Sequence, residues 1–261
     1  MPEVTKHLQG SFCWIELGTS DADGAKKFYS ELFGWTASDV PAGPDMVYTM
    51  LKLNGKDVGA LYKLTEQHKT QGVPPHWLSY ISVDSADESA ERAQQLGGKV
   101  VMAPFDVMDV GRMAMVQDPA GATFAIWQAR KHEGVGIKGE PGALCWNELA
   151  TTDTSKAKEF YTRLFGWSAR EGDVAGAYTK WLLDGVPIGG MMEIQPEWGN
   201  VPPHWTPYIQ VADCDATADK VKAFGGGLTM PPTDIPKVGR FAAIQDPQGA
   251  MISIVKLDHP G

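Results

Sequence analysis

The sequence predicts an α+β protein in which a unit of one strand, one helix and three further strands occurs four times. Residues 12–35 align without a gap with residues 144–167, with 14 identities in 24 positions. Residues 73–128 align in the same way with residues 201–256, with 25 identities in 56 positions. The two offsets, 132 and 128, differ by four residues, so the chain is a tandem duplication of roughly 130 residues per copy.

The duplication also sets the expected domain boundaries. A chain of 261 residues has the length of two domains of common size. We expect a first domain at residues 8–130, a linker at 131–142 and a second domain at 143–258. Residues 130–142 contain four glycines and one proline, a composition typical of a connection that few contacts cross.

Each copy begins with an apolar strand that carries a carboxylate. Phe12–Leu17 is rich in residues that favour strands, and Glu16 lies inside it. Leu144–Leu149 repeats the pattern with Glu148 at the equivalent place. Because an unpaired buried charge is costly, each glutamate needs either a partner or a function.

A helix and a hairpin follow the first strand. Ser20-Asp21 offers an N-cap, and Gly34 is a typical helix stop. Between them, the residues that fall at helical spacing are Ala25, Phe28, Tyr29, Leu32 and Phe33. Val47–Leu53 and Val58–Lys63 read as strands joined by a tight turn at Asn54-Gly55.

The second unit repeats this plan. His76–Val83 reads as a strand, and Asp84 or Asp87 is expected to cap a helix that Gly97-Gly98 ends. Three further strands are expected at Val100–Met102, Arg112–Gln117 and Thr123–Gln128. The Asp-Pro-x-Gly sequence before the last strand has the composition of a turn.

Composition excludes several classes of partner. The net charge of −9 argues against nucleic acid, because phosphate binding requires a basic surface. No apolar stretch approaches the roughly 20 residues of a membrane span, and the first residues lack a signal-peptide core. We expect a cytoplasmic protein, either a monomer with an internal pseudo-dimer or a homodimer. The odd number of cysteines, three, fits small buried side chains in a reducing compartment.

A duplicated βαβββ unit that closes with an Asp-Pro-x-Gly turn resembles the vicinal oxygen chelate superfamily, which includes glyoxalase I, extradiol dioxygenases and bleomycin-resistance proteins. The motifs of the first copy that carry the resemblance are Trp14-x-Glu16, Phe28-Tyr29, Phe33-Gly34-Trp35, Pro74-Pro75-His76-Trp77-x-x-Tyr80 and Gly111-Arg112-x-Ala114 before Asp118-Pro119-x-Gly121-Ala122, and all recur in the second copy. The chain is most similar to tandem glyoxalase-like proteins of actinobacteria, among them a mycobacterial culture-filtrate antigen and proteins labelled hydroxylases. The resemblance covers nearly the whole chain and implies two cup-shaped mixed sheets with helices outside.

The same resemblance implies a divalent metal held by His, Glu or Gln. The corresponding places carry Trp14, Leu78 and Ala125 in the first copy and Trp146, Thr206 and Ser253 in the second. None is a strong ligand, so we expect no metal and no other cofactor. A displaced site stays open, because Glu16 with His76, and Glu148 with His204, are each shifted by two residues and keep their face of the strand.

Glu16 and Glu148 are the candidate catalytic residues. At the floor of a hydrophobic cup, burial would raise the carboxyl pKa and suit a general base or a hydrogen-bond acceptor. The alternative is a structural carboxylate, paired with Arg112 or Arg240 or bonded to a tyrosine, Tyr80 or Tyr208.

Eight further residues are candidates for ligand binding, and each has a structural alternative. Trp14 and Trp146 either form aromatic walls for a flat ligand or fill the space that a metal ion once held. Tyr80 and Tyr208 orient a ligand or belong to the core, and His76 and His204 bind or lie at a rim. Arg112 and Arg240 bind an anion or form fixed ion pairs.

Three functions remain open. The first is a metal-independent small-molecule binding protein of the bleomycin-resistance kind, with two aromatic cups. The second is an enzyme, a lyase, isomerase or hydroxylase-like protein, acting on a small carbonyl metabolite with Glu16 or Glu148 as proton shuttle. The third is a metal-dependent glyoxalase or dioxygenase with a displaced site. The short spacing within each half favours cups built from adjacent units.

Overall fold

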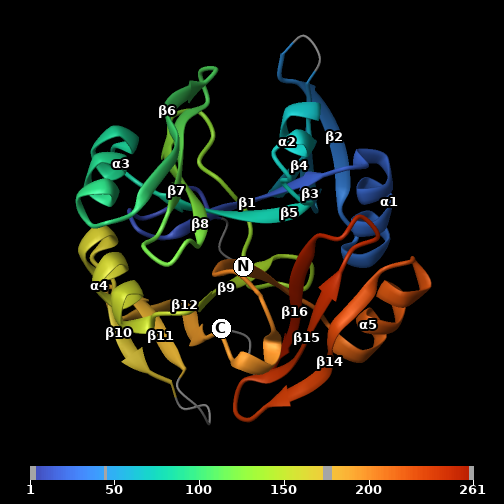
Figure 1. Ribbon diagram of the computed structural model, residues 1–261. Coiled ribbons are helices and arrows are strands. Elements are labelled where there is room, and N and C mark those ends of the chain that lie inside the picture. The colour runs from blue at the N-terminus through green and yellow to red at the C-terminus, as the bar shows by residue number, and fades with distance from the viewer. Residues whose placement is uncertain (1–3, 44–45, 173–177, 259–261) are drawn as a thin grey trace.

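The structure, a computed structural model, describes residues 4–43, 46–172 and 178–258. It contains two eight-stranded mixed sheets, one in each half of the chain (Figure 1). The elements of the first half are β1 (Phe12–Thr19), α1 (Ala22–Phe33), β2 (Thr36–Pro41), β3 (Val47–Leu53), β4 (Lys56–Lys63), α2 (Glu66–Thr70), β5 (His76–Ser82), α3 (Ala86–Gln95), β6 (Lys99–Val107), β7 (Gly111–Gln117) and β8 (Thr123–Ala129). Those of the second half are β9 (Leu144–Thr151), α4 (Thr154–Phe165), β10 (Ser168–Glu171), β11 (Thr179–Leu183), β12 (Val186–Glu193), the 3-10 helix η1 (Pro196–Trp198), β13 (His204–Gln210), α5 (Cys214–Ala223), β14 (Gly227–Ile235), β15 (Gly239–Gln245) and β16 (Met251–Leu257).

The topology confirms four βαβββ units and shows how they combine. The first sheet has the strand order β2-β3-β4-β1-β5-β8-β7-β6, and the second has the equivalent order β10-β11-β12-β9-β13-β16-β15-β14. Each sheet therefore joins two units that are adjacent in sequence, through antiparallel pairing of β1 with β5 and of β9 with β13. The sequence did not predict α2 and η1, which connect the two units of each half.

Local chemistry accounts for most element boundaries. Asp21 caps α1 by accepting a hydrogen bond from the Gly24 amide, and Gly34 ends the helix in the left-handed region at φ 72°. Asn54 and Gly55 both have positive φ, as the expected hairpin turn requires.

The predicted cap of α3 was wrong. Ser85, rather than Asp84 or Asp87, accepts the hydrogen bond from the Glu88 amide. The carboxylate of Asp87 instead lies in the first turn of the helix and pairs with Arg112. Neighbouring oxygen-bearing side chains can all cap a helix, so only the backbone geometry at its first residue decides between them.

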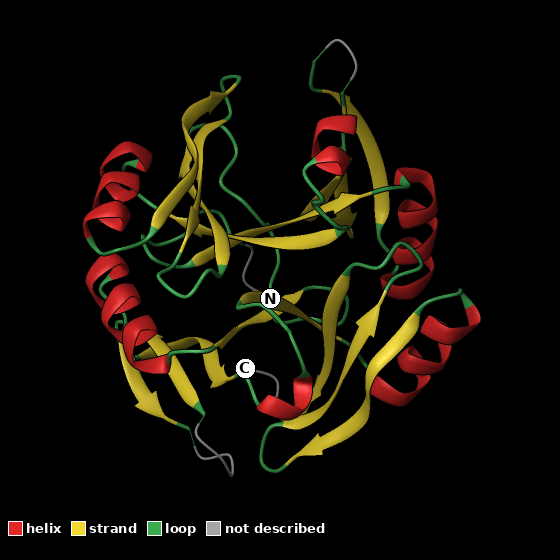
Figure 2. Cartoon of the chain, viewed as in Figure 1, coloured by secondary structure: helices red, strands yellow, loops and turns green. Residues whose placement is uncertain are grey.

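The convex sides of the two sheets pack on each other, and each apolar core joins units from different halves. One core combines α1 residues with α5 and the β15–β16 hairpin, and the other combines α3, β7 and β8 with α4. Accordingly α1 lies beside α5, and α3 beside α4, in Figures 1 and 2. Sheets thus form within each half, whereas the cores that hold the helices form between the halves.

A series of buried hydrogen bonds stabilises each of these contacts between the halves. Tyr29 of α1 donates to the Asp246 carboxylate at 3.0 Å and accepts from the Trp77 indole at 2.9 Å. Tyr161 of α4 makes the equivalent bonds to Asp118 and from Trp205, at 3.1 and 2.8 Å. Burial raises the pKa of both tyrosines, so they remain neutral donors.

The two turn aspartates act as expected for Asp-Pro-x-Gly turns. Asp118 also accepts three backbone N–H groups of its own turn, at 2.8–2.9 Å. Each helix tyrosine therefore holds the turn that precedes the last strand of the other half. No helix among the described residues is long and apolar enough to span a membrane.

The first strand departs from simple alternation. A bulge between Phe12 and Trp14 places Cys13 in the same buried cluster as Trp14, although strict alternation predicts opposite faces. Cys13 and Cys214 are buried as expected, and Cys145 is half-buried. The three cysteines are unpaired thiols.

We expect Tyr29→Phe and Tyr161→Phe to lower the free energy of unfolding by about 2 kcal/mol each, because each leaves the Oδ2 atom of a buried aspartate and an indole N–H without a partner. Urea denaturation of the full chain measures this. Thr36→Val, which removes an exposed hydroxyl with a 3.4 Å bond to the Lys52 carbonyl, is the control and should change little. An effect of the tyrosine changes no larger than that of the control would contradict this assignment.

Candidate functional site

Glu16 lies at the centre of the concave face of the first sheet. Its strand, β1, is one of the two middle strands, with Ala60 of β4 and Leu78 of β5 as neighbours in register. Glu16 is the one half-buried residue of a strand whose other residues are buried. Part of the side chain is therefore accessible from the concave side.

Two tyrosines fix the carboxylate of Glu16. Tyr48 of β3 donates its hydroxyl to Oε2 at 2.6 Å, and Tyr80 of β5 donates to Oε1 at 3.0 Å. The indole of Trp14 donates in turn to the Tyr48 hydroxyl at 3.2 Å. Each carboxylate oxygen thus receives one phenol and retains capacity to accept another hydrogen bond.

The second half repeats this cluster residue by residue. Tyr178 donates to Oε2 of Glu148 at 3.0 Å, and Tyr208 donates to Oε1 at 2.7 Å. Trp146 donates to the Tyr178 hydroxyl at 3.0 Å. A Cβ atom on Gly190 would lie 1.8 Å from that hydroxyl, so only glycine leaves room for Tyr178 to reach the glutamate.

The surroundings of both glutamates raise the pKa of the carboxyl group above its ordinary value. Loss of solvent raises the pKa of Glu16 and of Glu148, and the two phenol hydrogen bonds at each glutamate oppose this only in part. Burial and the adjacent glutamate raise the pKa of Tyr48 and Tyr80, so the phenols stay protonated as donors.

Tyr48 and Tyr178 were absent from the sequence-based candidates. They lie outside the two aligned blocks. Tyr48 is in β3 and Tyr178 directly precedes β11, and these strands reach the glutamates only through the order β3-β4-β1 or β11-β12-β9. One signal could have found them: the pair Tyr48-Thr49 recurs as Tyr178-Thr179 in the equivalent strand of the second half.

His76 and His204 begin β5 and β13, next to the glutamate strands. The Nδ1 atom of each lies 2.8 Å from the carbonyl oxygen two residues earlier, of Pro74 or Pro202. Because a carbonyl only accepts, Nδ1 carries the proton and Nε2 keeps a lone pair. Burial lowers the pKa of His76, which favours this neutral ring. Neither histidine is hydrogen-bonded to its glutamate.

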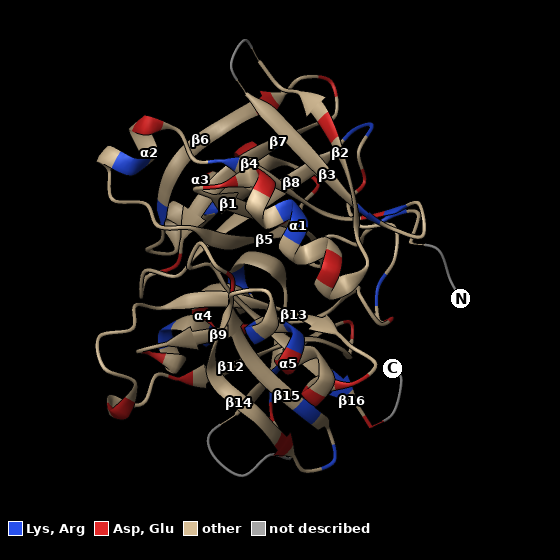
Figure 3. Ribbon diagram, turned by 90° about the vertical axis from the view of Figure 1, so that its right-hand side faces the viewer, with Lys and Arg blue, Asp and Glu red and all other residues tan. Residues whose placement is uncertain are grey.

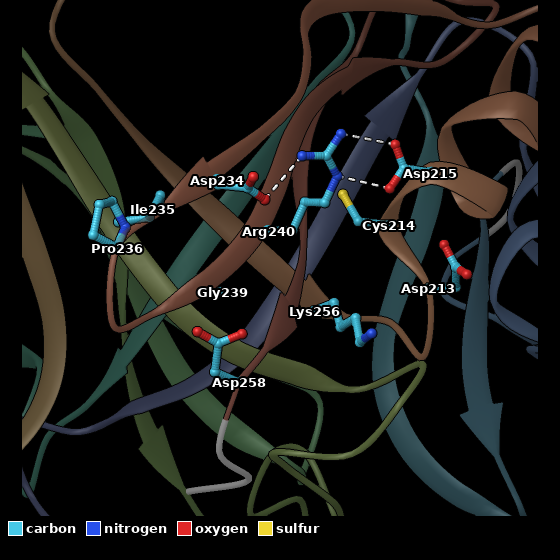
Figure 4. A pocket seen from close by; sticks show the side chains of 10 residues that line it. All are labelled: Asp213, Cys214, Asp215, Asp234, Ile235, Pro236, Gly239, Arg240, Lys256 and Asp258. Carbon is cyan, nitrogen blue, oxygen red and sulfur yellow. Dashed lines mark hydrogen bonds and ion pairs between the residues drawn. The ribbon is translucent and has the colours of Figure 1, made fainter.

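The structure does not bring Arg112 and Arg240 to the glutamates. Arg112 follows the alternation of β7 onto the helix side of the sheet, where it binds Asp87 with two hydrogen bonds and Asp106 with a third. Arg240 forms the equivalent bonds in the second half, two to Asp215 and one to Asp234, as Figure 4 shows. These contacts match the fixed ion pairs that the sequence left open as the alternative.

A cavity of about 350 Å³ lies beside Arg240, between the start of α5 and the β14–β15 turn, and Figure 4 shows the side chains that line it. Its lining includes Cys214, Lys256 and Asp258 but none of the Glu148 cluster. Two of its carboxylates, those of Asp215 and Asp234, already hold the guanidinium of Arg240.

The donor set does not fit a bound divalent metal. The places where the resemblance implies ligands carry an indole, an alkyl group and a methyl group in the first half, and an indole and two hydroxyls in the second. Both oxygens of each glutamate already accept phenol hydrogen bonds. Among residues 4–43, 46–172 and 178–258, no three His, Cys, Asp or Glu side chains are grouped as ligands.

Comparison of sequences identifies the family. A model of the Glyoxalase/Bleomycin resistance protein/Dioxygenase superfamily matches residues 11–126 and again residues 127–254, so the chain belongs to this superfamily. CFP32 of Mycobacterium bovis, which carries a provisional glyoxylase name, is 41% identical over 259 residues, covering 98% of both chains. DnrV of Streptomyces peucetius, named an anthracycline biosynthesis protein, is 36% identical over 265 residues, covering 97% of this chain and 96% of DnrV.

Solved structures share the fold. The Mn(II)-bound glyoxalase from Novosphingobium aromaticivorans superimposes with a TM-score of 0.63 at 16% identity, covering 97% of this chain and 86% of that one. The 2,3-dioxygenase LapB from Pseudomonas sp. KL28 gives a TM-score of 0.66 at 11% identity, covering 98% and 95%. At such low identity the likeness establishes the fold alone.

The raised pKa of Glu16 predicts the direction in which the free energy of unfolding changes with pH. The folded chain keeps this proton at a pH where the unfolded carboxyl, with its ordinary value of 4.5, has lost it. The contribution of Glu16 to stability is therefore full below that value and is lost as pH rises through the folded-state pKa. We expect Glu16→Gln to gain stability relative to the parent chain as pH rises through this window, measured by urea denaturation.

Asp87→Asn is the control of opposite sign. The hydrogen bonds from Arg112 lower the pKa of Asp87, so its contribution is present above the unfolded value and lost as pH falls. Asp87→Asn should therefore lose stability relative to the parent as pH rises. A Glu16→Gln chain whose stability follows that of the parent at every pH would refute a raised pKa at Glu16.

Proposed function

We propose that this protein binds a small planar molecule on a Glu–Tyr–Tyr–Trp floor, without using a metal ion. The observation that carries the proposal is a glutamate held by two phenols at the centre of a concave sheet, repeated in both halves. The phenol protons are already used, whereas the glutamate oxygens can accept another hydrogen bond. A ligand with an O–H or N–H group on a flat ring matches that acceptor and the aromatic walls.

The relatives and the charge distribution support a small organic ligand. The name of DnrV associates that relative with anthracycline biosynthesis, and a compound of that polycyclic aromatic kind would offer both flat rings and hydroxyl groups. Lys and Arg are intermixed with Asp and Glu over both halves in Figure 3, and the net charge of −9 offers no basic surface for nucleic acid. Three unpaired thiols fit a cytoplasmic location.

An enzyme acting on a small carbonyl compound is the second candidate. The raised pKa of Glu16 and Glu148 would let either carboxyl exchange a proton with a bound substrate under mild conditions. The neutral phenols would then hold the carboxyl in place while the proton moves. Turnover of a bound ligand distinguishes this candidate from simple binding.

Thermal denaturation with phenol, 4-nitrophenol and catechol tests the proposal. Ligand present at a hundred times its Kd stabilises the native state by about 2.7 kcal/mol, so at least one planar compound should raise the Tm by several degrees. The double variant Glu16→Gln with Glu148→Gln should respond much less, because an amide offers a poorer acceptor than a carboxylate.

Cyclohexanol is the matched ligand control. It carries the same hydroxyl group as phenol on a puckered ring, so it should leave the Tm unchanged if flat aromatic walls select the ligand. Equal shifts with cyclohexanol, or no shift with any planar compound, would contradict the proposal. A rise in Tm with Mn²⁺ or Zn²⁺ that Glu16→Gln and His76→Ala abolish would instead favour a displaced metal site.

A further inference from the structure

The two cups have the same floor but different walls. Equivalent residues on the concave faces differ between the two halves. Thr206 and Ser253 carry hydroxyl groups where the first half has Leu78 and Ala125. Met115 and Trp127 correspond to the smaller Ala243 and Val255, and Met113 corresponds to Phe241. Met50 corresponds to Lys180, and Tyr62 corresponds to Met192.

The first cup is filled by its own side chains. Nine buried residues form an apolar cluster on its concave face: Cys13, Trp14, Ala60, Leu78, Tyr80, Met113, Ala125, Trp127 and Val135. Trp127 packs so closely on Gly111 that a Cβ there would lie 2.2 Å from the ring. Trp14 is only 4% exposed. A cup packed in this way resembles a protein core more than a ligand pocket.

The linker between the halves completes this closure. The His132 ring lies edge-on to Trp14, with ring centroids 4.5 Å apart, and its carbonyl accepts the Trp127 indole N–H at 2.9 Å. Val135 is buried, and its amide donates to the Cys13 carbonyl at 2.8 Å. Residues 132–135 thus cover the tryptophan beside Glu16.

The second cup lacks this packing among the described residues. No buried apolar cluster forms on its concave face, and no ring in the described part of the chain packs on Trp146, which is half-buried. Phe241 is also half-buried and stacks on Tyr208, with centroids 6.4 Å apart at 29°. Two half-buried aromatic rings therefore contact the tyrosines that hold Glu148, Trp146 at Tyr178 and Phe241 at Tyr208.

Polar groups surround the same carboxyl. Thr206 stands opposite Glu148 in the pairing of β13 with β9, and Ser253 stands beside Tyr208 in the pairing of β13 with β16. Lys180, which makes a further interaction of its own, adds a positive charge to this wall. Where the first cup offers methyl and thioether groups, the second offers hydroxyl groups and a cation.

Building on the function proposed above, we propose that the second cup alone binds ligand, and that the ligand is a compact phenol-type ring. The ring lies against Trp146 and Phe241, and its hydroxyl group donates to the free acceptor capacity of Glu148. The hydroxyl of Thr206 bonds a second polar substituent on the ring. The first cup is a structural copy that keeps the floor of the duplicated unit but fills the space above it.

Isothermal titration of the full chain with 4-nitrophenol tests this assignment. We expect one molecule bound per chain. Glu148→Gln should weaken binding about tenfold through loss of the charged acceptor. Thr206→Leu combined with Ser253→Ala, which gives the second cup the residues of the first, should abolish binding. Met115→Ala, in the wall of the first cup, should leave stoichiometry and affinity as in the parent chain.

A second measurement needs no ligand and does not depend on whether the wall variants fold. In a chain labelled with 5-fluorotryptophan, a soluble gadolinium chelate should broaden the fluorine signal of Trp146 more than that of Trp14, with Trp146→Phe and Trp14→Phe assigning the signals. Equal broadening, two molecules bound per chain, or binding that survives the wall changes would overturn the assignment while leaving the proposed function intact. Absence of binding by every planar compound would overturn both.

Discussion

A carboxyl group placed in the middle of a sheet has to recover the hydrogen bonds that it loses with water. Both halves of this protein meet that constraint with two tyrosines, one from the strand of a hairpin and one from the neighbouring unit. The arrangement ties both units of a sheet to one side chain, because β3, β1 and β5, or β11, β9 and β13, must all be in register for the bonds to form. It also leaves a polar acceptor exposed to the concave face, which a hydrophobic floor would lack.

The chain separates folding from binding by using the two faces of each sheet differently. On the convex side, cores and tyrosine–aspartate bonds join units from different halves, so the halves stabilise each other. On the concave side of the first sheet, the described residues of the apolar cluster come from the first half and the linker alone. This division allows the two cups to differ: the first is covered by the linker, and the second has polar side chains and half-buried aromatic rings.

Local signals in the sequence were sufficient to predict the four βαβββ units, because helix caps, turns and the alternation of strands depend on only a few neighbouring residues. Asp21, Gly34 and the Asn54-Gly55 turn all behave as their chemistry predicts. The site was harder to predict because its contacts are long-range. Glu16 was recognisable as a polar residue in an apolar strand, and Tyr80 was among its expected partners, whereas Tyr48 meets it only through the pairing of three strands. The role of the linker, which carries no strong motif, depends on tertiary packing alone.

The central proposal is that a ligand binds at Glu148 in the second cup. A crystal structure of the full chain with 4-nitrophenol tests this most directly. We expect a ring between Trp146 and Phe241, with its hydroxyl oxygen within hydrogen-bond distance of the Glu148 carboxylate and the first cup filled by protein side chains. A ring found in the cavity beside Arg240, or a metal ion held by Glu148 and His204, would contradict it.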